Sequence, residues 1–214
     1  MGGNRRNPGA PRVPPSAYRM CARSRAPGML GHVLELWPDD GPVLVARDGL
    51  VLREWRASDV PVMVELFDTP EIDRSTPLPS PFDEAAATAY VERAHQARAD
   101  GTLQLAITED GEHPLGEVLV FPGGTERTVE IAYAVGADHR GRGLAVRSVL
   151  AVLDLAAEAG ATMARATIAV DNPASERVAL AADFRRGDVP LVDRSRKGYR
   201  LTVATWVRSL TPPS

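Results

Sequence analysis

The middle of the chain, residues 103–135, constrains the fold more than any other part. Three short apolar stretches there predict strands at Leu103 to Thr108, Leu115 to Phe121 and Val129 to Val135. The turn dipeptides Asp110-Gly111 and Gly123-Gly124 separate these stretches. Links this short join antiparallel neighbours, so the three strands are predicted to form a meander within one sheet.

A strand, helix and strand crossover follows the meander. The pattern predicts a helix over Leu144 to Ala159, ended by Gly160, and a strand over Ala164 to Val170. A helix that recrosses the sheet returns the chain to a strand parallel to the one that it left. The sheet is therefore predicted to be mixed.

The flanking segments supply the remaining elements. Val43-Leu44-Val45 and Leu50-Val51-Leu52 flank Asp48-Gly49 and predict a hairpin. Ser58 is predicted to cap a helix, the proline-rich stretch Pro70 to Pro81 to be a loop, and Glu84 to Arg98 to be a second helix. A helix over Pro173 to Phe184 and strands near 188–193 and 199–207 complete the order ββ-α-α-βββ-α-β-α-ββ.

Length and composition limit the chain to one globular domain of ordinary size. It has 214 residues, of which 44% are hydrophobic, and no apolar run approaches the ~18 residues that a membrane-spanning helix needs. The 25 basic and 28 acidic residues give a net charge of -3. This charge offers no overall attraction to nucleic acid or to an anionic membrane.

Residues 1–28 differ from the rest in composition, with six arginines, five prolines and no acidic residue. Such a segment cannot bury enough apolar surface to offset the entropy of ordering. Residues 1–40 are therefore predicted to be a disordered basic tail, and residues 41–210 to be the folded domain. Two other interpretations are a true start at Met29 and a tether to nucleic acid, and the acidic balance of the folded part does not support the second.

The number and spacing of the cysteine and histidine residues limit which disulfides and metal sites the chain can form. Cys21 is the only cysteine, so no disulfide can form within the chain, which fits a reducing cytoplasm. The histidines lack the spacing of a zinc site, and metal catalysis is not expected.

The loop Arg140-Gly141-Arg142-Gly143-Leu144-Ala145 lies between a predicted strand and a predicted helix. Its glycines remove the Cβ atoms that would keep a ligand from the backbone, and the first N–H groups of the helix have no partner within it. Arg140 and Arg142 add positive charge, so the loop is predicted to bind phosphate. A tight turn would explain the glycines but not the arginines beside them.

Two common phosphate loops do not fit this segment. A P-loop has Lys followed by Ser or Thr after its last glycine, where this chain has Leu144-Ala145. A Rossmann fingerprint would place Gly or Ala at Val146 and would lie near the start of the fold. Nucleoside triphosphates and dinucleotides are therefore disfavoured as ligands.

Four motifs together resemble the GCN5-related N-acetyltransferase (GNAT) superfamily. Its motif Gln/Arg-x-x-Gly-x-Gly/Ala is matched by Arg140, Gly143 and Ala145. The chain is most similar to the RimJ/RimL-like branch of ribosomal-protein N-terminal acetyltransferases. The motifs that it shares with that branch are Glu130-Ile131-Ala132-Tyr133, Asn172-Pro173-Ala174-Ser175 and Pro79-Ser80-Pro81-Phe82. The resemblance covers roughly residues 43–208, and motifs in this order are more specific than the loop alone.

The resemblance implies the GNAT fold, an α/β (α+β) fold with a mixed, mostly antiparallel sheet of about seven strands and helices on both faces. The parallel strands of its β-α-β crossover splay apart and hold acetyl-CoA. The residues implied for the pyrophosphate are Arg140, Gly141, Arg142, Gly143, Leu144 and Ala145. The pantetheine arm would follow the strand that ends at Val135 and contact Asn172, although Asn followed by Pro is also an ordinary helix cap.

The resemblance also implies N-acetyl transfer to a primary amine by direct attack, with acetyl-CoA as cosubstrate and no metal. Glu130 is the candidate base and Ser175 the candidate group beside the leaving sulfur. The structural alternatives are that Glu130 is a solvated residue on a strand face and that Ser175 only hydrogen-bonds the local backbone of its helix. The chain departs from the family pattern at two positions. Ala179 stands where many members have a Tyr that acts as the general acid, and Asp183 stands where Gly usually precedes Phe184.

Two functional classes stay open at this point. The chain is an enzyme or a domain that binds acyl-CoA without turning it over, and Ala179 keeps the second class open. The acceptor, a protein N-terminus or a small-molecule amine, is expected to meet the turn Arg194 to Gly198 and the loop 68–82 with Glu71, Asp73 and Arg74. No nucleic-acid or membrane partner is expected, and the chain is expected to be a monomer or a homodimer.

Overall fold

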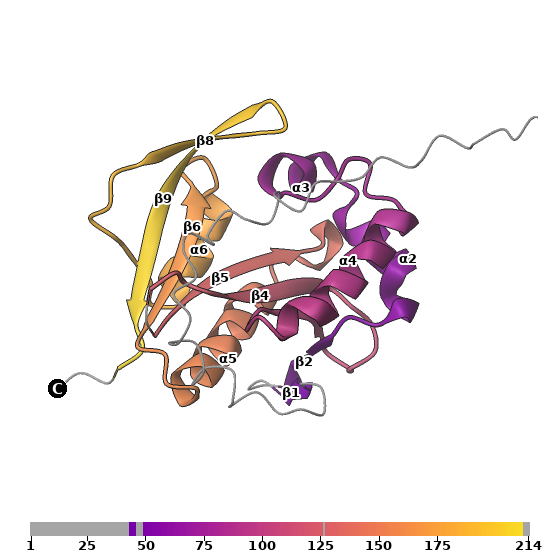
Figure 1. Ribbon diagram of the computed structural model, residues 1–214, viewed down its shortest axis with the longest axis horizontal. Coiled ribbons are helices and arrows are strands. Elements are labelled where there is room, and N and C mark those ends of the chain that lie inside the picture. The colour runs from indigo at the N-terminus through magenta and orange to yellow at the C-terminus, as the bar shows by residue number, and fades with distance from the viewer. Residues whose placement is uncertain (1–42, 46–48, 126, 212–214) are drawn as a thin grey trace, which may run out of the picture.

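The computed structural model describes residues 43–45, 49–125 and 127–211, which form one mixed sheet with helices on both faces (Figure 1). The sheet has nine strands in the order β1-β2-β3-β4-β5-β6-β9-β7, with β8 also paired to β9. Among the described strands, β5 and β6 are parallel and the other neighbouring pairs are antiparallel. The strands are β1 (Val43–Val45), β2 (Val51–Glu54), β3 (Leu103–Thr108), β4 (Gly116–Pro122), β5 (Thr128–Val135), β6 (Met163–Ala169), β7 (Arg185–Arg186), β8 (Val192–Arg196) and β9 (Tyr199–Ser209).

Two apolar clusters bury the faces of this sheet. On one face, α5 (Leu144–Glu158) and α6 (Pro173–Ala181) pack over the middle strands. On the other face lie α2 (Val60–Phe67), α3 (Pro70–Ser75) and α4 (Glu84–Arg98), around the aromatic rings of Trp55, Phe67, Phe82 and Tyr90. Helices on both faces explain why all six residues of β3 are buried. None of the described helices is long and apolar enough to cross a membrane.

A buried ion pair ties β2 to the helical layer. Arg53 donates to both carboxylate oxygens of Asp59 at 2.7 and 2.9 Å, at the end of the short 3-10 helix η3 (Ala57–Asp59). The same guanidinium donates to the carbonyl oxygens of Gly111 and Glu112, each at 2.6 Å. Removing one partner of such a buried pair costs about 3–5 kcal/mol, because the other charge stays buried. The pair therefore fixes the β3–β4 turn against the start of α2.

The predicted meander, crossover and mixed sheet are confirmed, but two helical predictions were wrong. Residues 70–75, predicted to be loop, form α3, because Pro70 occupies the first turn, where a missing N–H costs nothing, and Thr69 caps the helix. Ser58, predicted as a cap, lies inside η3, and α2 begins only at Val60, after Asp59.

The last strands also differ from the prediction. The strand expected near 188–193 is replaced by β7 and β8, with Pro190, which cannot donate to a strand ladder, between them. The sheet consequently has nine strands, one more than the eight of the predicted order. Helix α6 ends at Ala181, before the predicted Phe184. The predictions for residues 1–42, including the basic tail, the start at Met29 and Cys21, lie outside the described residues.

A buried carboxyl group adds a pH dependence to this fold. Glu117 of β4 accepts a hydrogen bond from the Tyr90 hydroxyl at 2.7 Å. Burial raises the pKa of Glu117 from 4.5 to about 7, against the opposing effect of that hydrogen bond. Because the pKa is higher in the folded chain than in the unfolded chain, folding takes up a proton in this window. The contribution of Glu117 to stability is therefore largest below about pH 4.5 and falls as the pH rises toward 7.

Glu117→Gln keeps an acceptor for Tyr90 and removes this titration. We expect the Glu117 carboxyl to lower the free energy of unfolding of the wild type by about 2 kcal/mol between pH 5 and pH 8, and the variant to lack this fall. Denaturant unfolding across that range measures the difference, with Glu158→Gln at the exposed end of α5 as the control. Parallel stability profiles for wild type and Glu117→Gln would contradict the assignment.

Candidate functional site

The pairing between β5 and β6 ends early, and the candidate site lies where it ends. Parallel pairing joins residues 128–130 of β5 to residues 163–165 of β6, so that Glu130 and Arg165 are the last pair. On their outer edges, β5 pairs with β4 and β6 pairs with β9, over seven residues each. Beyond Glu130 the two strands separate (Figure 1), and no described strand pairs with residues 131–135 on that side. A ligand with amide groups could add to this free edge as another strand would.

The glycine loop follows directly after β5 and the 3-10 helix η4 (Ala137–His139). Gly141 and Gly143 have left-handed φ angles of 76° and 72°. A Cβ atom at Gly141 would meet nothing within 4 Å, and one at Gly143 would meet only Arg147 Cδ, at 3.9 Å. Gly143 is the N-cap residue of α5, and it provides no side chain to cap the first N–H groups of the helix. The loop is therefore open where a pyrophosphate would lie, and a side chain would fill that space.

Carboxylates hold both arginines of the loop. Arg140 donates to Glu71 Oε2 at 2.8 Å and, through Nε, to the carbonyl oxygen of Val135 at 3.1 Å. Arg142 is ion-paired with Glu109, which also lies 3.5 Å from Arg147. Exposed ion pairs such as these contribute little to stability. A phosphate group can therefore replace the carboxylates at both arginines.

Glu130 faces the α2, α3 and α4 side of the sheet, as the alternation of β5 predicts. Val129 and Ile131 belong to the α5 cluster, whereas Ala134 packs against the other cluster. The Glu130 side chain is half-buried, and the Thr167 hydroxyl of β6 donates to its Oε1 at 3.0 Å. A carboxylate thus lies at the point where the two strands separate.

Ser175 lies on the opposite face, in the first turn of α6. Asn172 caps this helix, since its Oδ1 accepts from the Ser175 N–H at 3.0 Å. The Tyr133 hydroxyl of β5 donates to the Ser175 carbonyl oxygen at 3.0 Å, and burial raises the pKa of Tyr133 to about 12. The backbone of Ser175 is therefore held at both its N–H and its carbonyl. Ala179, one turn further on, is a buried core residue.

Helix α3 carries three charged residues that reach three different segments. Glu71 pairs with Arg140 in the glycine loop, and Arg74 pairs with Asp171 just before α6. Asp73 accepts from Lys197, in the turn between β8 and β9, at 2.6 Å, and this hydrogen bond lowers the pKa of Asp73. The two segments that were expected near the acceptor, 68–82 and 194–198, are thus joined to each other (Figure 1).

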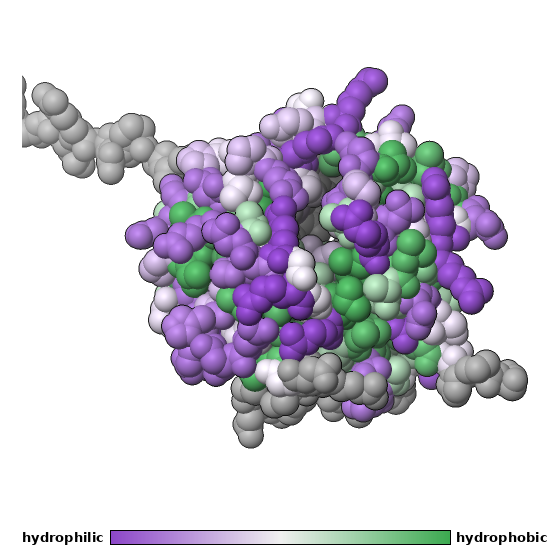
Figure 2. Space-filling view, turned by 180° about the vertical axis from the view of Figure 1, so that it is seen from behind, coloured by the Kyte–Doolittle hydropathy of each residue, from purple (hydrophilic) through white to green (hydrophobic). Residues whose placement is uncertain are grey.

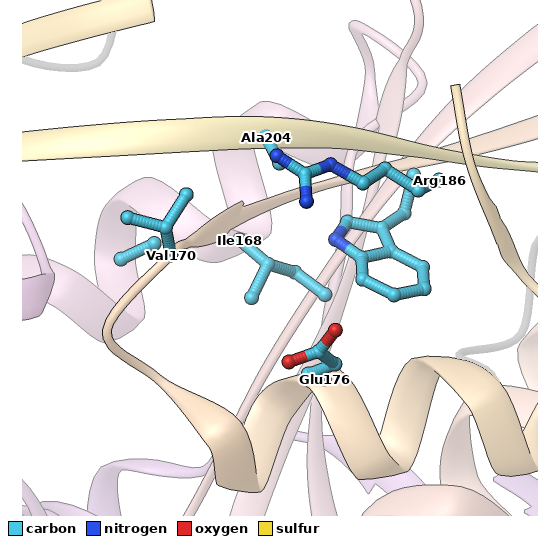
Figure 3. A pocket seen from close by; sticks show the side chains of 7 residues that line it. Ile168, Val170, Glu176, Arg186 and Ala204 are labelled. Atoms are coloured by element: carbon cyan, nitrogen blue, oxygen red, sulfur yellow. The ribbon is translucent and has the colours of Figure 1, made fainter. Parts of the chain in front are cut away.

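The surface has a hollow and a separate small pocket. Figure 2 shows the hollow in the upper middle of the face seen from behind, with hydrophilic residues on both sides of it. The pocket, of about 40 Å³, lies between α6 and strands β6, β7 and β9, and Glu176 and Arg186 face each other across it (Figure 3). It has room for a few water molecules but not for a pantetheine arm, so it is not part of the candidate site.

The structure gathers the sequence-predicted residues in two places. Val135, Arg140, Gly141, Arg142, Gly143, Leu144 and Ala145 lie in one continuous segment from the end of β5 to the start of α5. Glu130, Asn172 and Ser175 lie along the separation of β5 and β6, on the two faces of the sheet. Within the described ranges, no group of three or more His, Cys, Asp or Glu side chains could hold a metal ion.

Sequence reasoning missed the contacts that cross this separation. Thr167 was not singled out, and no hydrogen-bonding partner was predicted for Tyr133. The Glu-Ile-x-Tyr motif includes Tyr133 and could have drawn attention to it. Thr167 carries no comparable signal, because its partner depends on the register between parallel strands joined by a whole helix.

Comparisons with known proteins agree with this geometry. The family model of the acetyltransferase (GNAT) domain matches residues 49–185. Mycobacterium smegmatis RimJ in complex with CoA-disulfide is similar in fold, with 21% identity, a TM-score of 0.69, and coverage of 81% of this chain and 88% of that chain. RimL, a ribosomal L7/L12 alpha-N-protein acetyltransferase, shows 20% identity, a TM-score of 0.68, and coverage of 79% and 94%.

A third structural relative was determined with its cofactor. The putative acetyltransferase yncA from Salmonella typhimurium, in complex with acetyl-CoA, has 18% identity and a TM-score of 0.59, with coverage of 78% of this chain and 97% of that chain. No curated protein matches the sequence.

The family match covers more than half of the chain. It includes Glu130, the glycine loop and the cap of α6. The chain therefore belongs to the GNAT acetyltransferase domain family, and it is an acyltransferase.

Proposed function

We propose that the protein transfers the acetyl group of acetyl-CoA to a primary amine, a protein N-terminus or the amine of a small molecule, by direct attack. The proposal rests mainly on the Glu130 carboxylate, which lies where β5 and β6 separate. Glu130 belongs to the strand that leads into the open glycine loop. The similarity in fold to RimL, named an alpha-N-protein acetyltransferase, favours testing a protein N-terminus first.

The glycine loop is the proposed site for the pyrophosphate of acetyl-CoA. The open space at Gly141 and Gly143 and the uncapped start of α5 support this assignment. Backbone N–H groups at Leu144 and Ala145 and the guanidinium groups of Arg140 and Arg142 would hold the negative charge. The free edge of β5 up to Val135 would pair with the amide groups of the pantetheine arm, and the amide of Asn172 would face it.

The proposed chemistry needs one base and one group at the sulfur. Acetyl-CoA supplies the acyl group as a thioester. The amine nitrogen forms a bond to the thioester carbonyl carbon, the carbon–sulfur bond breaks, and CoA leaves as the thiolate. Glu130 accepts the proton that the amine loses, directly or through a water molecule, and the Ser175 hydroxyl donates a hydrogen bond to the sulfur. Holding amine and thioester together supplies the rest of the rate.

An acceptor panel tests the proposed function. Release of free CoA thiol would be measured with N-terminal peptides, aminoglycoside-like amines and small metabolite amines. We expect thiol release with at least one of these amine classes. Thiol release with none of them, together with a rise in Tm on adding CoA, would instead support a domain that binds acyl-CoA without turnover. A reducing cytoplasm and a monomeric or dimeric state remain predictions.

Gly143→Asp is expected to weaken CoA binding severely. The carboxylate would occupy the phosphate path, and the loss of two charge-assisted hydrogen bonds of about 1.5 kcal/mol each corresponds to roughly a hundredfold rise in Kd. Gly49→Asp is the matched control, because Gly49 has a φ of 75° and equally open space but lies in the β1–β2 turn. Titration calorimetry that gives both variants the affinity of the wild type would refute the loop assignment.

Glu71→Gln is expected to tighten CoA binding. The substitution removes the carboxylate that competes with phosphate for Arg140, so the Kd should fall about two- to fivefold at low salt, and less at high salt. The control is Glu112→Gln, which removes a similarly exposed ion pair with Arg56, away from the loop. A Kd that does not change, or changes equally in both variants, would show that Glu71 and the ligand do not compete.

Glu130→Gln is expected to lower turnover by ~10²-fold near neutral pH, while the Kd for CoA stays unchanged. Turnover should recover in part at high pH, where the acceptor is already a free amine and needs no base. The measurement is the pH–rate profile with saturating acceptor from pH 6 to 9. Equal turnover of wild type and variant across this range would mean that proximity carries the rate and that Glu130 is not the base.

A further inference from the structure

Thr167 makes the hydrogen bond that crosses the separation of β5 and β6 beside the candidate base. Its hydroxyl oxygen lies 3.0 Å from Glu130 Oε1. The last paired residues of the two strands are Glu130 and Arg165, so Thr167 lies two residues beyond the end of the pairing. The Glu130 side chain therefore reaches forward across the opening to the neighbouring strand.

Strand pairing and partial burial restrict the movement of Thr167. It lies within the seven paired residues of β6 and β9, opposite Thr205, whose side chain is buried. Thr167 is itself half-buried, and its branched Cβ restricts rotation about χ1. A donor restricted in this way holds one carboxylate oxygen of Glu130 in a fixed place. The two oxygens of a carboxylate offer about four acceptor sites, so one hydrogen bond does not saturate the group.

We propose that Thr167 is a positioning residue for the acetyl transfer, which orients the Glu130 carboxylate toward the acceptor amine. The inference rests on the proposed function of Glu130 as base. A hydrogen bond donated to one oxygen of a carboxylate fixes the orientation of the group, so the same contact directs the other oxygen. A threonine that merely fastens two strands would affect stability but not the turnover that depends on Glu130.

The side chain at residue 167 separates these two roles. Thr167→Val keeps the shape and removes the donor, whereas Thr167→Ser keeps the donor. We expect Thr167→Val to lower kcat about tenfold, with unchanged Kd for CoA and unchanged KM for the acceptor. Thr167→Ser should stay within about twofold of the wild type. Arg165, the strand partner of Glu130, is unchanged in every variant.

A double-mutant cycle with Glu130→Gln decides the inference. If Thr167 acts through Glu130, then Thr167→Val should cost less than about twofold in the Glu130→Gln background. A tenfold loss in both backgrounds, or a wild-type kcat for Thr167→Val, would overturn it. If Glu130→Gln alone equals the wild type, the proposed base fails and this inference fails with it.

Carboxyl NMR separates the inference from the acetyl-transfer assignment. The chemical shift of the labelled Glu130 carboxyl carbon would be measured at one fixed pH with CoA bound, without turnover. We expect this chemical shift to move in Thr167→Val, which loses the hydrogen bond, and to stay at the wild-type value in Thr167→Ser. This readout holds even if no amine in the acceptor panel reacts. Identical chemical shifts in all three proteins would overturn the inference, whatever the panel shows.

Discussion

Three residue pairs hold β5 to β6, whereas each of these strands is held to its outer neighbour over seven pairs. The sheet can therefore open in its middle while each half keeps its own hydrogen-bonded scaffold. The opening leaves the backbone groups of residues 131–135 without a strand partner on one edge, and such groups require other partners. An extended ligand with amide groups can provide them, and the residues that would act on that ligand lie along the same edge.

Side-chain contacts replace the missing backbone pairing across this opening. On the face of α2, α3 and α4, Thr167 donates to Glu130, and on the face of α5 and α6, Tyr133 donates to Ser175. Each contact joins β5 to the β6–α6 half and involves one of the two candidate catalytic residues. The apolar cluster around α5 includes residues of both halves, so the opening lies on a continuous core. The strands separate locally, and the core beneath them stays packed.

The elements that the sequence predicts well depend on local interactions. Helix α4 has the predicted bounds, Glu84–Arg98, because its cap and apolar spacing are written in adjacent residues. Helix α3 was missed because proline excludes a helix interior but favours its first turn, and only the placement of Pro70 decides between these effects. At Asp183, the chain has a residue that departs from the family pattern, and the backbone tolerates it. Asp183 adopts the left-handed φ of 56° that Gly usually supplies, and Phe184 is still buried.

The same distinction between local and distant interactions applies to the candidate site. The glycine loop was predictable because its glycines, arginines and following helix are contiguous. The partners of its arginines, Glu71 and Glu109, were not predictable, because they lie 69 and 33 residues away in the sequence. Thr167 is a further case, since it lies 37 residues from Glu130 and α5 separates the two in the sequence. Contacts of this kind follow from the register of the whole sheet rather than from any single segment.

The ion pairs of α3 link two regions that a reader of the sequence would treat separately. One short helix is held at once by the glycine loop, by the turn between β8 and β9 and by the segment before α6. An anion that takes Arg140 from Glu71 removes one of these three attachments, so the remaining two hold α3 less firmly. By thermodynamic reciprocity, a molecule that displaced α3 from the β8–β9 turn would raise the affinity of the loop for anions by the factor by which the anion eases that displacement. Such a coupling would run through a single six-residue helix.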